Sequence, residues 1–253
     1  MRTRPTARIL HGITMLLSVI IPVRNAEGPL LKTLDSLKAA DPLAEWLEII
    51  VQDGGEIETS PTDQRIKRYR ETDSGIYDAM NKGRSKATGR WLMFAGAGDE
   101  WIGGSDIRAK LENAFAPLQV FAVELKPPLE PGVRRHYPAR WDASMIWRNS
   151  VHHQGVCYRA DVLPSRPFET EYKVLSDYAL HLRFFRNDMK AEVHKTPMMQ
   201  VASGGISRQF TWQLYQEELR LKRQVLGPVR GAIQWPWICA KWLYKRIAQS
   251  HHR

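Results

Sequence analysis

The chain has 253 residues, of which 43% are hydrophobic and 25% are charged, a composition typical of one large globular domain with or without appendages. It excludes a disordered tail protein, a collagen and a multi-span membrane protein. The formal net charge of +10 belongs to the two ends, because residues 1–14 contribute +3, residues 204–253 contribute +7, and residues 15–203 hold 25 basic and 25 acidic side chains.

Residues 1–14 form a basic N-terminal extension, which the apolar run at 15–23 follows. This run is at the short end for the apolar region of a signal peptide, and Arg24 and Asn25 close it without a small-residue cleavage site. It is also far shorter than the roughly 20 residues that a membrane-spanning helix needs. We therefore interpret it as a buried strand.

Strand-like and helix-like segments alternate through the first half of the chain. The expected strands are apolar runs with β-branched residues, and the expected helices carry apolar residues every three or four positions. The strands are predicted at 16–23, 46–51 and 90–94, and the helices at 27–40 and 76–88. Such alternation with short connections predicts an α/β fold with a mainly parallel sheet and helices on both faces.

The pattern is less regular in the second half. Strands are predicted at 119–125 and 152–158, with a proline-rich connection at 126–140 and a helix at 174–187. The two cysteines, Cys157 and Cys239, are too few and too far apart for a disulfide framework, which indicates a reducing compartment.

Polar side chains follow three of the predicted strands. In open α/β sheets, ligands bind at the carboxyl ends of the strands, and Asn25, Asp53 and Asp99 are expected to lie there. Asp73 lies in a glycine turn before the helix at 76–88, whose N-terminus suits a phosphate group. The small residues around Asp99 leave room for a hydrated divalent ion and a diphosphate.

The C-terminal segment, residues 208–253, differs in kind. Its stretch 233–247 holds three tryptophans together with Lys241, Lys245 and Arg246, a mixture that favours the membrane–water interface. A helix that packs its aromatic rings on the domain is the alternative, and a single-stranded nucleic-acid surface is a weaker one. We expect a helical, membrane-associating segment and no nucleic-acid partner.

From residue 15 to residue 207 the chain resembles glycosyltransferase family 2, which has the GT-A fold, and in particular the colanic-acid-biosynthesis type of bacterial exopolysaccharide transferase. Seven segments carry the resemblance in the family's order, and the string at 71–83 is the most specific of them. The segments are LSVIIPVRN at 17–25, VQDGGE at 51–56, ETDSGIYDAMNKG at 71–83, GRWLMFAGAGDEW at 89–101, HHQGVCYR at 152–159, EYKVLSDYALHLR at 171–183 and SGGIS at 203–207.

The resemblance implies a mixed, mainly parallel Rossmann-like sheet and a role for each matching residue. Asp177 would be the general base, Asp99 would hold a divalent metal (Mn or Mg), and His153 and Gln154 would face the acceptor. The nucleotide and donor sugar would lie against ten residues: Pro22, Arg24, Asn25, Asp53, Asp73, Gly75, Tyr77, Asp78, Asn81 and Lys82.

The implied function is inverting, metal-assisted transfer of a sugar from a nucleotide-sugar donor. The acceptor is expected to be a lipid-linked oligosaccharide of bacterial exopolysaccharide, capsule or lipopolysaccharide. The enzyme would work in the cytoplasm, peripheral to the inner face of the plasma membrane, with its C-terminal segment on anionic lipid.

Two departures from the family pattern keep alternatives open. Gly98 stands where the family commonly has a second acid, and the turn after Asp53 reads GGEIE. One alternative is a non-catalytic member of the same fold that binds a nucleotide or glycan. The other is a nucleotidyltransferase, although the loop at 23–27 lacks the glycine- and arginine-rich character that such an enzyme needs.

Overall fold

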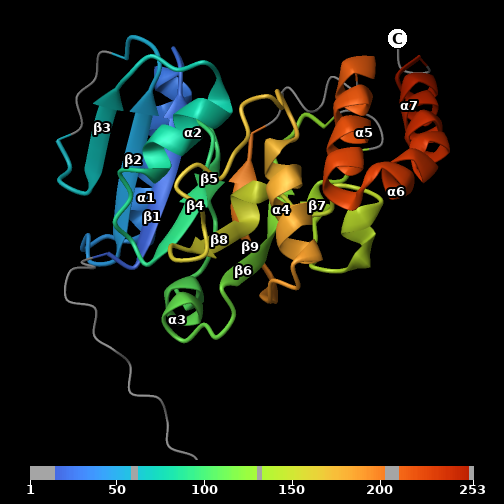
Figure 1. Ribbon diagram of the computed structural model, residues 1–253. Coiled ribbons are helices and arrows are strands. Elements are labelled where there is room, and N and C mark those ends of the chain that lie inside the picture. The colour runs from blue at the N-terminus through green and yellow to red at the C-terminus, as the bar shows by residue number, and fades with distance from the viewer. Residues whose placement is uncertain (1–14, 58–61, 130–132, 203–210, 251–253) are drawn as a thin grey trace, which may run out of the picture.

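The structure is a computed structural model that describes residues 15–57, 62–129, 133–202 and 211–250. The N-terminal extension at 1–14 and the SGGIS segment at 203–207 lie outside these ranges. Within them the chain forms a mixed nine-stranded sheet with helices on both faces (Figure 1). The strand order is β3-β2-β1-β4-β8-β6-β9-β5, with β7 paired to β6.

The strands fall close to where the sequence predicts them in the first half of the chain. They are β1 (Leu17–Val23), β2 (Leu47–Asp53), β3 (Ile66–Arg70), β4 (Trp91–Phe94), β5 (Glu100–Trp101), β6 (Leu118–Leu125), β7 (His136–Tyr137), β8 (Val156–Arg159) and β9 (Ala191–Val201). The pairs β3–β2, β2–β1 and β1–β4 are parallel. Their carboxyl ends therefore meet at one edge, as the alternating pattern predicts.

The second half of the sheet supplies the antiparallel pairs that make this mainly parallel sheet a mixed one. Among the described residues β8 runs antiparallel to both β4 and β6, and β5 runs antiparallel to β9, whereas β6 and β9 are parallel. Because β8 is reversed, its N-terminal end lies at the same edge as the carboxyl end of β4. This reversal brings residues just before β8 to the edge where the parallel strands end.

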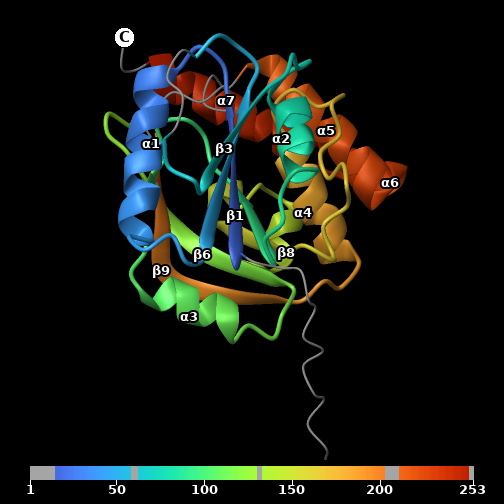
Figure 2. The same ribbon diagram turned by 90° about the vertical axis from the view of Figure 1, so that its left-hand side faces the viewer.

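Helices cover the two faces of the sheet unequally. The first four are α1 (Glu27–Ala40), α2 (Ile76–Arg84), α3 (Asp106–Glu112) and α4 (Ser176–Arg186). Figure 2 shows α1 on one side of the strands and α2 and α4 on the other. Side chains that alternate along one strand enter different cores: Val19 and Ile21 pack with α1 and α3, whereas Ile20 packs with α2 and α4.

Two short segments differ from the sequence prediction. Helix α2 ends at Arg84, although the periodicity predicts a helix to residue 88. Residues His153–Gly155 form a 3₁₀ turn, η2, at the place where the start of a strand was predicted. A second 3₁₀ turn, η1, spans Ala143–Ile146. The η2 turn places His153 outside the strand, at the edge where the parallel strands end.

Three helices form the C-terminal part: α5 (Trp212–Leu226), α6 (Pro228–Ile233) and α7 (Trp235–Ser250). Helix α5 contributes Leu221, Val225 and Leu226 to the same core as α2 and α4, so it is an integral part of the folded body. Pro236 occupies the first turn of α7, a position that tolerates proline because its N–H has no helical partner. None of the described helices is both long enough and apolar enough to cross a bilayer.

Candidate functional site

The loops after β1, β2 and β3 are in contact at the carboxyl edge of the sheet. The Asn25 side-chain oxygen accepts a hydrogen bond from the backbone N–H of Glu56 at 3.2 Å. A Cβ atom added at Gly54 would lie 1.8 Å from an oxygen of Asp73, and one added at Gly55 would lie 2.2 Å from the Asn25 oxygen. Glycine at both positions thus allows the three loops to approach, and Asn25, Asp53 and Asp73 surround one site.

Asp53 is held firmly at this edge. Its carboxylate accepts a hydrogen bond from the backbone N–H of Gly55 at 2.9 Å and is paired with Arg68 at 2.9 Å. Arg70 lies 3.6 Å from the same carboxylate. Burial alone raises the pKa of Asp53, but the hydrogen bonds from Gly55 and Arg68 outweigh burial and lower the pKa below its usual value. The carboxylate is therefore ionised and fixed in position.

The two arginines beside Asp53 were not identified from the sequence. Both belong to β3, a short strand of mixed exposure that shows no continuous apolar run. The alternation of Arg68 and Arg70 in IKRYR is the one local signal that could have placed them on the same face. They add positive charge beside the loops that follow β1 and β2.

The N-terminus of α2 follows Asp73 directly. Asp73 accepts a hydrogen bond from the backbone N–H of Gly75 at 3.0 Å, and Gly75 has φ of 138°, a conformation that favours glycine. Asp78 accepts from the backbone N–H of Ser74 at 3.2 Å and pairs with Lys82 at 3.2 Å. The hydrogen bond from Ser74 is the main cause of the lowered pKa of Asp78. These contacts fix the turn that opens α2.

The remaining residues that were expected at the donor site differ in what they contact. Both polar atoms of the Asn81 side chain form hydrogen bonds with the backbone of Phe168, at 2.7 and 3.0 Å. This amide therefore fixes the loop that contains Phe168. Lys82 also donates to the carbonyl of Thr72. Pro22 is buried within β1, whereas Arg24 is exposed just beyond it.

Asp99 ends the turn after β4. One carboxylate oxygen accepts from the backbone N–H of Gly96 at 2.7 Å, and the other accepts from Ala202 at the end of β9 at 2.8 Å. Gly98 has φ of 99°, which favours glycine at this position and gives a physical reason for the missing second acid. The structure places no group of three potential metal ligands together among the described side chains.

A single carboxylate can still serve a divalent ion in this setting. Mg²⁺ is commonly bound by one or two carboxylates together with phosphate oxygens and water. Each Asp99 oxygen has a second lone pair beyond the one that its backbone partner uses. Asp99 therefore fits an ion whose other ligands come from a diphosphate.

Asp177 lies in the first turn of α4 and is buried. One of its oxygens accepts from the backbone N–H of Tyr178 at 2.8 Å and from the hydroxyl of Tyr77 at 3.2 Å. The other lies 3.0 Å from Nδ1 of His153, which the η2 turn presents. Burial on its own raises the pKa of Asp177, but the hydrogen bond and charge of His153 lower it below the usual value. The structure thus joins the expected base to a residue expected on the acceptor side.

Two further histidines lie beside this pair. Burial lowers the pKa of His152, whose Nδ1 is 2.9 Å from the Gln154 side-chain oxygen. Burial lowers the pKa of His181 to about 4, and its Nε2 is 2.5 Å from the Tyr158 hydroxyl. Both rings are therefore neutral near pH 7. Neither His181 nor Tyr158 was identified from the sequence as a neighbour of Asp177.

A carboxylate from α5 supports the start of α4. Glu217 accepts hydrogen bonds from three consecutive backbone N–H groups, at 2.9, 2.8 and 2.7 Å: Lys173, Val174 and Leu175. The carbonyl of Val174 in turn accepts from the Tyr77 hydroxyl at 2.6 Å. No local sequence signal could have revealed Glu217, because its partners lie more than 40 positions earlier in the chain.

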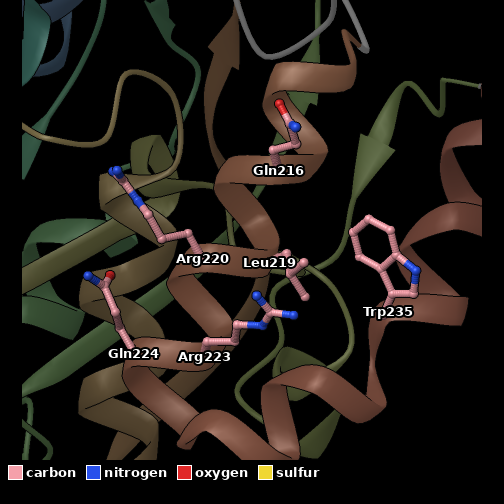
Figure 3. Close-up of a pocket in the computed structure, with 6 residues that line it drawn as sticks. All are labelled: Gln216, Leu219, Arg220, Arg223, Gln224 and Trp235. Carbon is pink, nitrogen blue, oxygen red and sulfur yellow. The ribbon is translucent and has the colours of Figure 1, made fainter.

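A separate cavity of about 410 Å³ lies against α5, away from the carboxyl edge of the sheet. Figure 3 shows Arg220 and Gln224 on one side of α5, and Arg223 extending toward the side on which Trp235 of α7 lies. The six residues that line the cavity are Gln216, Leu219, Arg220, Arg223, Gln224 and Trp235. The cavity belongs to the C-terminal helices.

Sequence comparisons relate the chain to enzymes that transfer sugars. Residues 18–109 match the model of the family described as Glycosyl transferase family 2. The PGL/p-HBAD biosynthesis glycosyltransferases of Mycobacterium bovis (strain BCG / Pasteur 1173P2) and Mycobacterium tuberculosis (strain ATCC 25177 / H37Ra) are each 28% identical over 263 residues, which cover 93% of this chain and 97% of the relative.

Solved structures show the same fold. TarS of S. aureus, residues 1–349 in complex with UDP-GlcNAc, superposes with a TM-score of 0.62 at 16% identity, over 82% of this chain. This chain spans 65% of the length of that TarS chain. The mannosyltransferase PcManGT of Pyrobaculum calidifontis, in complex with GDP-Man and Mn²⁺, superposes with a TM-score of 0.52 at 18% identity, over 93% of this chain and 75% of its own.

Proposed function

We propose that this chain, which matches the model of Glycosyl transferase family 2 over residues 18–109 and has a GT-A fold, transfers a sugar from a nucleoside diphosphate sugar to a glycan acceptor with inversion. One observation carries this proposal: Asn25, Asp53, Asp73 and Asp99 converge at one edge of the sheet. The Asp177–His153 pair lies at the N-terminus of α4, which contacts α2 through Tyr77. Donor, leaving group and proton acceptor can thus be held together.

The residues divide the chemistry between them. Loss of a nucleoside diphosphate builds negative charge on its phosphate oxygens, which the N-terminal end of α2 and nearby positive side chains can stabilise. Asp99 would hold a Mn or Mg ion, which supplies Lewis-acid stabilisation of that leaving group. The acceptor hydroxyl attacks from the opposite side of the anomeric carbon, and the Asp177–His153 pair receives its proton.

The acceptor and the cellular location are inferred from the C-terminal helices. Large apolar side chains are exposed on α6 and α7, including Val229 at 71% and Ile233 at 67%. Arg220, Arg223 and Trp235 line the cavity beside them (Figure 3). Aromatic, aliphatic and basic side chains together suit an anionic membrane surface such as the cytoplasmic leaflet. A lipid-linked glycan of bacterial surface-polysaccharide synthesis, presented at that surface, is the acceptor that this arrangement favours.

Thermal unfolding in the presence of nucleotides tests the proposal. We expect one of UDP, GDP, dTDP and CMP to raise the melting temperature in the presence of Mn²⁺, because a ligand at 100 times its Kd adds about 2.7 kcal/mol to the free energy of unfolding. Asp99→Asn should lose the metal-dependent part of this shift. Asp106→Asn, at an exposed position of α3, is the matched control and should keep it.

Each outcome has a clear meaning. Stabilisation by one nucleotide names the base of the donor, and release of that nucleotide from the corresponding sugar donor then shows turnover. Binding without turnover on any donor would favour a non-catalytic member of the family. If no nucleotide stabilises the protein, the assignment of the donor site to Asp53 and Asp99 is wrong.

A further inference from the structure

We propose that Nε2 of His153 is the atom that accepts the proton of the acceptor hydroxyl, and that Asp177 is the positioning residue that holds His153. This inference rests on the proposed glycosyl transfer and specifies one atom of its mechanism. It changes the role that the sequence alone suggests for Asp177, which is to take the proton directly.

The first argument is that protein groups already occupy the Asp177 carboxylate. One oxygen accepts from Tyr178 N–H and Tyr77 O–H, and the other accepts from His153 Nδ1. The carboxylate is also enclosed, since the Asp177 side chain is 10% exposed. Oδ1 of Asp177 has both lone pairs in use, so a substrate hydroxyl could bond only to the second lone pair of Oδ2, the oxygen that His153 covers.

The second argument is the state of the His153 ring. Because Nδ1 faces the ionised carboxylate, it carries the proton in the neutral imidazole, and the lone pair is then on Nε2. The His153 side chain is 18% exposed, more than that of its partner. The pair therefore presents a basic nitrogen outward and keeps the carboxylate inside, the arrangement by which an aspartate orients a catalytic histidine in hydrolases.

The third argument is position. The η2 turn that carries His153 contacts β4, the strand that leads into the Asp99 turn. It also contacts β9, and Ala202, just after β9, donates to the Asp99 carboxylate. His153 thus lies on a turn that packs against the strands on both sides of Asp99.

The proposed step is balanced in atoms and charge. The acceptor oxygen forms a bond to the anomeric carbon while the bond from that carbon to the diphosphate oxygen breaks, and its electron pair leaves with the nucleoside diphosphate. The hydroxyl proton moves to Nε2 of His153, and the resulting imidazolium is stabilised by the Asp177 carboxylate. The proton then passes to solvent, because His153 is partly exposed.

Several titratable groups surround His153. The ring faces Asp177 and His181 of α4, and its own neighbour His152 lies within electrostatic reach of Asp99. Tyr77 of α2 and, behind it, Glu217 of α5 lie next to Asp177. The ionised Asp177 carboxylate is thus the group placed to stabilise the imidazolium that forms when the ring accepts a proton.

Imidazole ¹⁵N NMR tests the geometry without a substrate. We expect the His153 ring, assigned by its absence in His153→Gln, to be the Nδ1–H tautomer in the wild type. In Asp177→Ala the preference for this tautomer should be lost, because no carboxylate then accepts the Nδ1 proton. A His153 ring that carries its proton on Nε2 in the wild type, or whose tautomer is unchanged in Asp177→Ala, would overturn the proposal.

Kinetics test the role. Hydrolysis of the UDP, GDP, dTDP or CMP sugar that corresponds to the stabilising nucleotide is measured as nucleotide release. His153→Gln should lower kcat by about 10²- to 10⁴-fold, the usual contribution of a general base, while KM for the donor and stabilisation by the nucleotide stay as in the wild type. His136→Gln, the same change at an exposed histidine of β7, should behave as the wild type.

The two proposals fail in different ways. If His153→Gln keeps the wild-type rate while Asp177→Asn is inactive, Asp177 is the direct base and the inference is wrong, although the transferase function stands. If His153→Gln loses nucleotide stabilisation instead of rate, the histidine contacts the diphosphate. If the wild type turns over no donor, the proposed function itself fails. The NMR experiment still measures the tautomer of His153 beside Asp177 in that case.

Discussion

Two glycines after β2 decide how closely the donor loops can approach. A side chain at Gly55 would meet both the Asn25 oxygen at 2.2 Å and the Asn25 backbone nitrogen at 2.9 Å, so the clash is partly with backbone that cannot rotate away. A side chain at Gly54 would meet the Asp73 carboxylate. The sequence pattern marks these residues as a turn, but their contacts show that they are spacers between three loops.

We expect Gly55→Ala to weaken nucleotide-induced stabilisation, because the Asn25 side chain must turn away from the new methyl group and the Asn25 backbone nitrogen, 2.9 Å from that group, must shift. Gly28→Ala is the matched control: a Cβ there meets nothing within 4 Å, and alanine favours the helix by up to about 1 kcal/mol. Thermal unfolding with and without the stabilising nucleotide measures both effects. A Gly55→Ala protein that binds as the wild type would show that these loops do not form the donor site.

At the scale of elements, α5 is what holds the start of α4 in place. Glu217 binds the backbone N–H groups of residues 173–175, and Asp177 follows two residues later. Helix α4 has no side-chain cap at its N-terminus, so the carboxylate of a neighbouring helix performs that task. The proposed catalytic site therefore depends on a helix beyond the part that the family model matches.

Glu217→Gln should destabilise the fold by about 1.5 to 3 kcal/mol, because an amide offers one acceptor where the carboxylate offers two charged ones. The rate of transfer should fall as well, since the segment that carries Asp177 loosens. Glu171→Gln is the matched control, because that half-exposed side chain lies 3.9 Å from Arg220 and bonds none of these groups. Chemical denaturation measures the change in the free energy of unfolding, and kcat measures the change in rate. An unchanged kcat would show that catalysis does not depend on the hydrogen bonds of Glu217.

A buried lysine links α5 to the rest of the molecule. Lys222 is fully buried, donates to the Trp147 carbonyl at 2.9 Å and pairs with Glu218 at 2.8 Å. Glu218 also pairs with Lys241 of α7 at 2.6 Å. Burial lowers the pKa of Lys222 to about 8. The C-terminal helices are thus joined by charges inside the protein as well as by apolar contacts.

This lysine gives the stability a defined pH dependence. Between pH 8 and the unfolded pKa of about 10.4, the unfolded chain holds the Lys222 proton and the folded chain does not, so the Lys222 contribution to stability rises with pH. Across this window the wild type should gain up to about 3 kcal/mol relative to Lys222→Met. Urea denaturation at pH 7.5 and 10 measures the difference, and Lys32→Met is the exposed control. A constant difference between wild type and variant would contradict the prediction.

At the scale of the whole molecule, the sugar-transfer edge and the apolar helices occupy different parts of one body. The sheet and its loops form one part, and α5, α6 and α7 gather beside α4 at the far side (Figure 1). Large apolar side chains remain exposed on α6 and α7, with Leu243 at 53% and Ile247 at 49%. Such a surface can meet a membrane while the carboxyl edge stays accessible to a donor from solution.

The triple variant Val229→Ser, Ile233→Ser and Leu243→Ser should lose sedimentation with vesicles that contain phosphatidylserine, whereas the wild type should sediment with them and less so at high salt. The control is the pair Leu43→Ser and Phe115→Ser, which removes two equally exposed apolar side chains from loops elsewhere in the fold. Sedimentation of the triple variant at the wild-type level would show that the apolar side chains of α6 and α7 do not bind the membrane.

The sequence by itself determined several elements of the first half of the chain and the resemblance to glycosyltransferase family 2, because both depend on short runs of consecutive residues. The apolar run of β1, the periodicity of α1 and the string at 71–83 depend on neighbours within a few positions. The segments of weak periodicity, such as β3 and β9, were missed because their burial comes from the sheet on which they pack.

Only the tertiary structure decided which side chains act together. Asp177 meets His153, 24 positions away, and Tyr77, 100 positions away, and Glu217 reaches Leu175 across 42 positions. The sequence named Asp177, His153 and Tyr77 separately but could not pair them, and it gave no sign of Glu217. Hydrogen bonds between distant residues depend on the path of the chain in space. Here the reversed strand β8 brings His153 to Asp177, and the packing of α5 on α4 brings Glu217 to Leu175.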